Sequence, residues 1–74
     1  MRVLLFGAIA ERAGMDVIES HAGSLALLKQ DLEERIIGLR EMSYALAVDR
    51  KLMIGDAPLT GKEEVAVLPP FAGG

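Results

Sequence analysis

The chain has 74 residues, of which 51% are hydrophobic and 26% charged, and its net charge is −3 at neutral pH. This length supports one domain with one core and argues against a deep catalytic cavity. The negative net charge disfavours nucleic acid as a partner. The chain has no cysteine and one histidine, His21. A thiolate nucleophile, a Ser-His-Asp triad and a metal site are therefore not expected.

No apolar stretch approaches the ~20 residues that a membrane-spanning helix needs. Glu11 and Arg12 follow the first apolar run too closely for a signal peptide. We therefore expect a cytoplasmic protein without a membrane partner.

Two strands are predicted in the first twenty residues. The apolar run 2–6 predicts a strand whose side chains alternate between two faces. A short alanine-rich helical stretch over 8–13 should end at Gly14, because glycine is common just beyond a helix C-terminus. The segment 16–20 predicts the second strand, antiparallel to the first.

The only long helix is predicted after Ser24, which is a plausible N-cap. Apolar side chains recur at steps of three or four residues and should form one buried stripe, consisting of Leu25, Leu28, Leu32 and Ile36. Asp31 and Arg35 form a favourable i,i+4 pair. Gly38 is predicted to end the helix as its C′ residue.

Three more strands are predicted in the second half of the chain. The segment 44–48 is followed by a tight turn at 49–50 and a short strand at 51–54, and the last strand covers 64–68. Pro69 and Pro70 must end that strand, because proline cannot donate a ladder hydrogen bond.

This element order predicts an α+β domain, a mixed sheet covered on one face by a single long helix. Its simplest closure places the first and last strands side by side and parallel at the centre, which is the β-grasp arrangement of ubiquitin-like proteins. The domain should cover residues 1–70, and residues 71–74 should project as a flexible tail.

No conventional catalytic group stands out among the polar residues. His21 lies in a polar turn without a partner at ligand spacing, so we interpret it as a surface residue. The neighbouring carboxylates at 33–34 and at 63–64 are pairs in the sequence only, and both are interpreted as solvated. Those at 63–64 cannot act as a pair, since successive residues on a strand face opposite ways.

The diglycine Gly73-Gly74 is the candidate reactive group. Glycine has no Cβ, so a tail of this kind can pass through a narrow channel of an activating enzyme. Once ATP has adenylated the carboxylate, sulfide or a persulfide can attack it and leave a thiocarboxylate. A sulfur carrier of this kind needs no cysteine.

An apolar patch is predicted near this tail. Arg2 marks the outward face of the first strand and Glu64 marks that of the last strand. Alternation then turns four apolar side chains outward, namely Leu4, Phe6, Ala66 and Leu68. If the two strands are neighbours, these side chains form a contiguous surface suited to a protein partner.

The ending Leu68-Pro69-Pro70-Phe71-Ala72-Gly73-Gly74, together with the opening segment 2–8, resembles the small subunits of molybdopterin synthase, the MoaD family. The segment 61–64 and Asp49 differ from that family's usual pattern. The resemblance implies a β-grasp fold and conversion of Gly74 to 1-thioglycine by a ubiquitin-activating-like adenylating enzyme that consumes ATP. The carrier itself would bind no cofactor and contribute no catalytic side chain.

The resemblance further implies partners and contact residues. The tail would insert into the large synthase subunit, in a heterotetramer of two small and two large subunits that converts cyclic pyranopterin monophosphate to molybdopterin. Leu52 would join the patch as a further contact. The tail would contribute the remaining contacts through Pro69, Pro70, Phe71, Ala72 and Gly73.

Three alternatives remain open. A thiamine-type sulfur carrier would share the fold and the terminal chemistry, although the Pro-Pro-aromatic segment favours the molybdopterin pathway. A ubiquitin-like modifier would form isopeptide bonds with lysines of its targets. A β-grasp interaction module with an inert tail would show no ATP-dependent change at its C-terminus.

Overall fold

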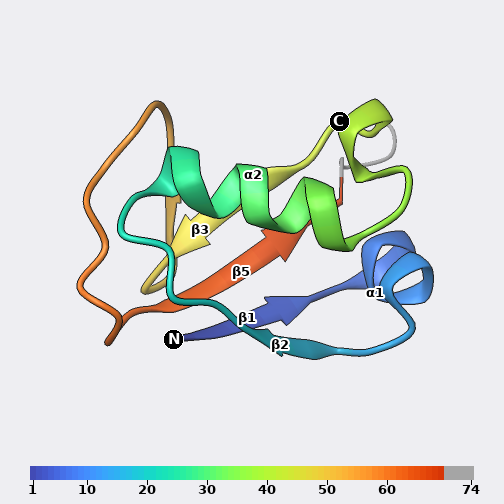
Figure 1. The fold of residues 1–74 in the computed structure, drawn as a ribbon, viewed down its shortest axis with the longest axis horizontal. Helices are drawn as coiled ribbons and strands as arrows, with labels where there is room; N and C mark the ends of the chain where they lie inside the picture. Colours follow the sequence, from blue (N-terminus) through green and yellow to red (C-terminus); the bar gives the residue numbers. More distant parts are fainter. Residues whose placement is uncertain (70–74) are drawn as a thin grey trace.

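The computed structural model describes residues 1–69, which form one five-stranded sheet with helices packed against it (Figure 1). The strands are β1 (Arg2–Leu5), β2 (Val17–Glu19), β3 (Ala45–Val48), β4 (Lys51–Met53) and β5 (Glu64–Leu68). The helices are α1 (Gly7–Ala13), α2 (Leu25–Arg35) and the 3₁₀ helix η1 (Leu39–Glu41).

The strand order is β2-β1-β5-β3-β4, with β1 and β5 at the centre (Figure 1). These two strands run parallel, and every other neighbouring pair is antiparallel. The α2 helix crosses one face of the sheet. The predicted mixed sheet of β-grasp type with one long covering helix is confirmed.

The core lies between α2 and the central strands. The predicted helical stripe is buried, with Leu28 and Leu32 fully inaccessible to solvent. On the facing side of the sheet, Val3 of β1 and Val65 and Val67 of β5 are equally inaccessible. Burying a side chain of this size stabilises a fold by about 1.5–3 kcal/mol, so this layer supplies the main cohesion of the domain.

The start of α2 is held by two side chains from different parts of the chain. Ser24 Oγ accepts a hydrogen bond from the Leu27 N–H at 3.2 Å, which confirms the predicted N-cap. Asp56 Oδ1 accepts one from the Ala26 N–H at 2.9 Å. A carboxylate beside a helix N-terminus also interacts favourably with the helix dipole, so the 54–58 loop is fastened to the helix.

The prediction that Gly38 is the C′ residue of the long helix is wrong. The helix ends at Arg35, and Ile36 leaves helical geometry with φ −110° and ψ 112° while its side chain stays buried. Gly38, at φ +84°, instead precedes η1, which buries Leu39 completely. The left-handed conformation is therefore used to turn the chain into a second helical segment.

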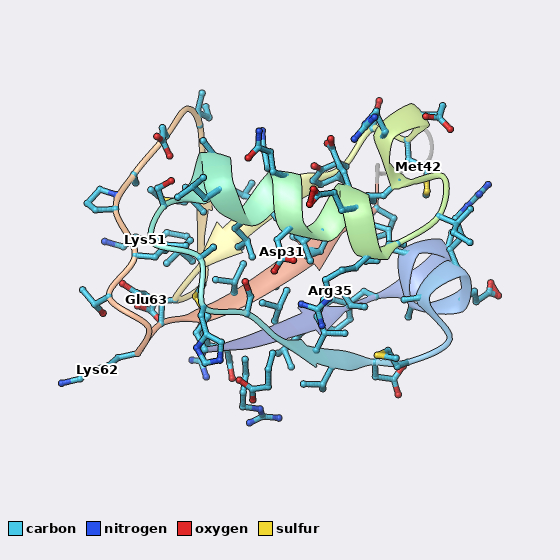
Figure 2. All side chains as sticks on the ribbon, in the orientation of Figure 1. Asp31, Arg35, Met42, Lys51, Lys62 and Glu63 are labelled. Atoms are coloured by element: carbon cyan, nitrogen blue, oxygen red, sulfur yellow. The ribbon has the colours of Figure 1, made fainter. Side chains whose placement is uncertain are left out.

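A polar cluster fastens the middle of α2 to the end of β2 (Figure 2). The buried Ser20 hydroxyl donates to Asp31 Oδ2 at 2.8 Å. Arg35 Nη1 donates to the Glu19 carbonyl at 2.7 Å and lies 3.3 Å from Asp31 Oδ2, as the predicted i,i+4 pair requires. Because the buried hydroxyl has its partners, this cluster positions the helix without leaving a buried polar group unsatisfied.

Candidate functional site: the outer sheet face beside residue 69

The face of the sheet away from α2 carries one apolar row that crosses all five strands. In β1 the odd-numbered side chains face the core, so Leu4 points outward, and the register pairs it with Ala66 of β5. The same register extends the row to both edge strands. The outer-face row consists of Val17, Leu4, Ala66, Ala47 and Leu52.

The outer-face row has small side chains in the middle and larger side chains on either side. Ala66 and Ala47 are opposite each other on β5 and β3, where two methyl groups leave the sheet surface shallow. Leu4 flanks them on one side, and Leu52 flanks them on the other with 60% of its surface exposed. An exposed apolar surface of this kind suits a protein partner.

Two further apolar side chains extend this surface toward the end of β5. Phe6 follows β1 directly and is 44% exposed. Leu68 closes β5 opposite Ala45 of β3. The opposite end of the outer face is polar, since the register places Arg2 between Glu19 and Glu64. The apolar part of the outer face therefore lies next to residue 69, where the described chain ends.

The structure brings together the five side chains predicted for the sheet surface. Leu4, Phe6, Ala66 and Leu68 lie on the outer face, and so does Leu52. Val17 and Ala47 also belong to this surface and were not predicted. The alternation with Glu19 already turns Val17 outward, but membership of the row depends on cross-strand register, which a local pattern does not contain.

Pro69 is the last described residue of the chain, and its ring packs close to Gly7. A Cβ placed on Gly7 would lie 3.2 Å from Pro69 Cγ, so the absence of a side chain there lets the proline ring pack against the start of α1. Gly7 has φ +55°, a conformation that favours glycine. The other predicted tail residues lie outside the described part of the chain, namely Pro70, Phe71, Ala72, Gly73 and Gly74.

Two carboxylates that were interpreted as solvated are held by specific partners. Glu33 Oε2 accepts a hydrogen bond of 2.7 Å from the Tyr44 hydroxyl, and Glu33 Oε1 lies 3.5 Å from Arg40 Nε. Glu63 accepts hydrogen bonds from the Thr60 and Gly61 backbone. Glu34 and Glu64 beside them are exposed, as predicted, and the partners of Glu33 and Glu63 were not predicted, because they come from turns that a strand pattern does not describe. His21 is exposed, as predicted.

The hydrogen bonds to Glu63 also change its titration. Hydrogen bonds from the Thr60 backbone N–H, and then from Glu63's own N–H, the Gly61 N–H and the Thr60 hydroxyl, lower the pKa of Glu63 to about 2. Within residues 1–69, no group of three or more acidic or histidine side chains is arranged to hold a metal ion. In the same part of the chain, no helix is both long and apolar enough to span a membrane.

Comparison with known proteins gives one family. The family model described as the ThiS family matches residues 3–74, which is almost the whole chain. A search of curated proteins gives no match.

Proposed function

The chain belongs to the ThiS family of ubiquitin-like sulfur carriers, and we propose that it carries sulfur as a thiocarboxylate on Gly74 and donates it within molybdopterin synthase. Carriers of this family work with partner enzymes. The observation that carries the proposal is the apolar outer face next to Pro69, since it would seat a partner beside the segment that bears the reactive group.

The proposed reaction takes place on the carboxylate of Gly74. The carboxylate attacks the α-phosphorus of ATP, pyrophosphate leaves, and an acyl adenylate forms on the adenylating enzyme. A sulfide nucleophile then attacks the carbonyl carbon, a C–S bond forms and AMP leaves with the electron pair of the broken C–O bond. The carrier contributes the acyl group and the docking surface, while the partners contribute the catalytic side chains.

The chain's own residues contribute positioning. Docking on the outer face buries Phe6 and Leu52, which are large side chains already exposed in the free chain. Proline restricts φ, so Pro69 and Pro70 should reduce the backbone entropy that is lost when a channel receives the residues that follow. Gly73 and Gly74 then enter that channel without side chains.

The choice of the molybdopterin pathway is supported by the segment 68–71. Its Leu-Pro-Pro-Phe order before Ala-Gly-Gly resembles the synthase small subunits more closely than a thiamine-type carrier. We propose the large synthase subunit and a ubiquitin-activating-like enzyme as the two partners, with two small and two large subunits in the synthase. A cytoplasmic location follows from this assignment.

Intact-mass analysis tests the carrier chemistry. The chain is incubated with a cognate adenylating enzyme, ATP and a sulfide source, and the expected product has one sulfur in place of one carboxylate oxygen. A variant extended by one alanine after Gly74 is the matched control, because its fold should not change. An unmodified chain would contradict the proposal, and a product joined to lysine side chains would identify a protein modifier instead.

Product analysis tests the pathway. The thiocarboxylated chain is supplied separately to a molybdopterin synthase large subunit with cyclic pyranopterin monophosphate, and to a thiazole synthase with its substrates. Molybdopterin is the expected product of the first mixture. Sulfur transfer only in the second mixture would assign the chain to thiamine synthesis and leave the carrier chemistry intact.

A further inference from the structure

The strand β4 forms one edge of the sheet and carries two exposed apolar side chains. Within residues 1–69, β4 pairs with β3 on one side and with no strand on the other. Leu52 is 60% exposed, and Ile54, the residue directly after β4, is 99% exposed. Residues two apart share a face of a strand, so both side chains lie on the outer face, beside the sheet edge.

The backbone of β4 directs hydrogen-bonding groups away from the sheet at the same two residues. The register pairs Val48 with Lys51 across a two-residue turn, a position at which both residues exchange backbone hydrogen bonds. The N–H and C=O groups of Lys51 and Met53 therefore point toward β3. Those of Leu52 and Ile54 point outward, because the direction alternates along an antiparallel pair.

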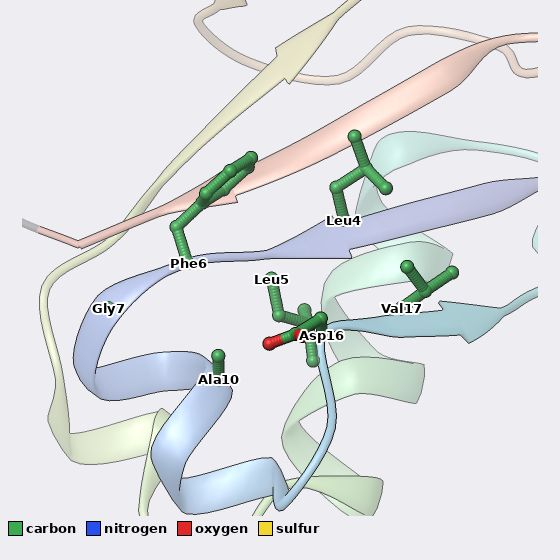
Figure 3. Close-up of a pocket in the computed structure, with 7 residues that line it drawn as sticks. All are labelled: Leu4, Leu5, Phe6, Gly7, Ala10, Asp16 and Val17. Carbon is green, nitrogen blue, oxygen red and sulfur yellow. The ribbon is translucent and has the colours of Figure 1, made fainter.

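The edge strand on the other side of the sheet, β2, is partly covered. Arg35 Nη1 donates to the Glu19 carbonyl at 2.7 Å, so a side chain from α2 already occupies this edge. The outer-face side chain of β2 is Val17, which lies along a groove of about 390 Å³ (Figure 3) and is 38% exposed. Since exposed strand edges tend to pair with other strands, β4 is the edge better suited to a partner.

We propose that two copies of this chain associate through β4, which pairs antiparallel with β4 of the second copy across a two-fold axis at Met53. This register places Leu52 opposite Ile54 of the second copy, and the symmetry repeats the pair. The paired residues exchange both backbone hydrogen bonds and bring their exposed apolar side chains into cross-strand contact. A register centred on Leu52 would instead place Ile54 against Arg50, whose φ of 72° does not continue a strand.

Opposite charges meet in the register centred on Met53. It places Lys51 opposite Gly55 of the second copy, where a Cβ would find no heavy atom within 4 Å. The next residue, Asp56, binds the Ala26 N–H at 2.9 Å and so lies on the α2 side of the sheet. Lys51 shares that side with Met53, which packs against the core.

Lys51 therefore reaches Asp56 of the second copy, and the two-fold symmetry forms this ion pair twice. An extended segment of an unrelated protein would not supply this match of charges and side chains. The charge complementarity favours a second copy of the chain as the partner of β4.

An interface limited to one strand edge belongs to the small and transient class, below about 1,200 Å² of buried surface. We therefore expect a dimer that forms at roughly millimolar chain concentrations and dissociates on dilution. The association does not rest on the proposed function. Leu52 belongs both to this edge and to the outer-face row, so a partner that covers the outer face competes with the second copy.

Sedimentation equilibrium of the full chain measures the association, and amide hydrogen exchange locates it. The average mass should approach that of a dimer as the chain concentration rises. The amides of Leu52 and Ile54 should exchange more slowly at high concentration, whereas those of Lys51 and Met53 should be protected at every concentration. In a mixture of isotope-labelled and unlabelled chains, NOEs between copies should connect Leu52 methyl groups with those of Ile54.

The chain offers matched variants for this test. Ile54→Lys places a charge in the proposed interface, whereas Ile37→Lys places one after the end of α2, at a side chain that is 86% exposed. The first change should weaken the association about tenfold or more, and the second should leave it unchanged. Lys51→Glu should also weaken it, because two carboxylates then face each other, and Lys62→Glu at another exposed lysine is its control.

A chain that stays monomeric at millimolar concentrations would overturn the proposal and leave the β4 edge to a different protein. An association that survives Ile54→Lys would overturn it as well. Concentration-dependent protection at Val17 instead of Leu52 would place the interface on β2, and NOEs between the two copies of Leu52 would contradict the register.

Discussion

At the scale of single residues, the fold changes the titration of Tyr44. It is the single tyrosine of the chain, and its hydroxyl donates to Glu33 Oε2 at 2.7 Å. Burial raises the pKa of Tyr44 well above its ordinary value of 10, and the hydrogen bond to the negatively charged Glu33 raises it further. Because the folded state favours the neutral phenol, Tyr44 contributes stability that is complete below pH 10 and declines as the pH rises above it.

We expect tyrosinate absorbance to stay absent from the folded chain at pH values where free tyrosine is already ionised. A Glu33→Gln chain should ionise earlier, although still later than free tyrosine, because the effect of burial remains. Spectrophotometric titration of both chains checks this order. Ionisation of the unsubstituted folded chain near pH 10 would contradict the structure.

The stability contributed by Glu63 should depend on pH in the opposite direction. Its carboxylate accepts hydrogen bonds from the Thr60 N–H at 2.9 Å and from the Gly61 N–H at 3.0 Å, which hold its pKa near 2 against an ordinary 4.5. The stability that Glu63 contributes is therefore present above pH 4.5 and is lost as the pH falls toward 2. This loss should accompany protonation of a side chain that holds the 60–63 turn.

Urea unfolding of the original chain and a Glu63→Gln chain measures this contribution. The original chain should be the more stable of the two above pH 4.5, and the difference should shrink as the pH approaches 2. The other carboxylates titrate in both chains, so the difference isolates Glu63. A difference that does not depend on pH would show that the carboxylate charge has no role in the turn.

At the scale of elements, the β3–β4 hairpin uses residues that are unusual for its turn. Asp49 and Arg50 both have positive φ, at 48° and 72°, a pair of values that a type I′ hairpin turn requires and that Asn-Gly adopts most readily. Asp49 adds a tertiary contact, because its Oδ1 accepts a hydrogen bond of 3.0 Å from the Glu64 N–H. The hairpin is thereby joined to the start of β5.

Arg50→Gly should raise the free energy of unfolding by about 1 kcal/mol, since a non-glycine residue in the left-handed region costs about 1–2 kcal/mol and glycine returns part of this as unfolded-state entropy. Asp49→Gly is the matched control, and it should bring no such gain, because it also removes the acceptor for the Glu64 N–H. Denaturant unfolding compares the three chains. Equal gains at both positions would show that the Asp49 contact contributes nothing.

At the scale of the whole molecule, one face of the sheet packs in the core and the other face is exposed. The inner face and α2 hold the core, where Leu28 is fully buried, whereas Phe6 is 44% exposed on the outer face. Leu28→Ala should lower the free energy of unfolding by about 2–5 kcal/mol through lost transfer energy and the cavity left behind. Phe6→Ala should lower it by less, because much of this side chain is already in contact with solvent.

The same Phe6→Ala chain should bind the proposed large subunit about thirtyfold more weakly, which corresponds to about 2 kcal/mol for an apolar anchor at an interface. Urea unfolding and calorimetric titration separate the two effects. Normal binding together with a large loss of stability in the Phe6→Ala chain would place Phe6 in the core and not on a docking surface.

Local periodicity in the sequence by itself determined most of the elements. The alternation in 2–6 and 64–68, the stripe from Leu25 to Ile36 and the cap at Ser24 predicted which residues form strands and helix and which side chains point inward. These features depend on residues at most four positions apart, so the sequence contains them directly. The diglycine Gly73-Gly74, taken together with this element order, favoured a sulfur carrier and left a ubiquitin-like modifier open.

Only the tertiary structure decided which distant residues meet. The register of five strands placed Val17, Ala47 and Leu52 in one row with Leu4. The partners of Glu33 and Glu63, like the role of Gly38 before η1, were not predicted. Each of these depends on how turns and strands from separate parts of the chain pack, and a one-residue change of register would redirect every side chain of a strand. No local pattern specifies the register, because burial of the shared core selects it.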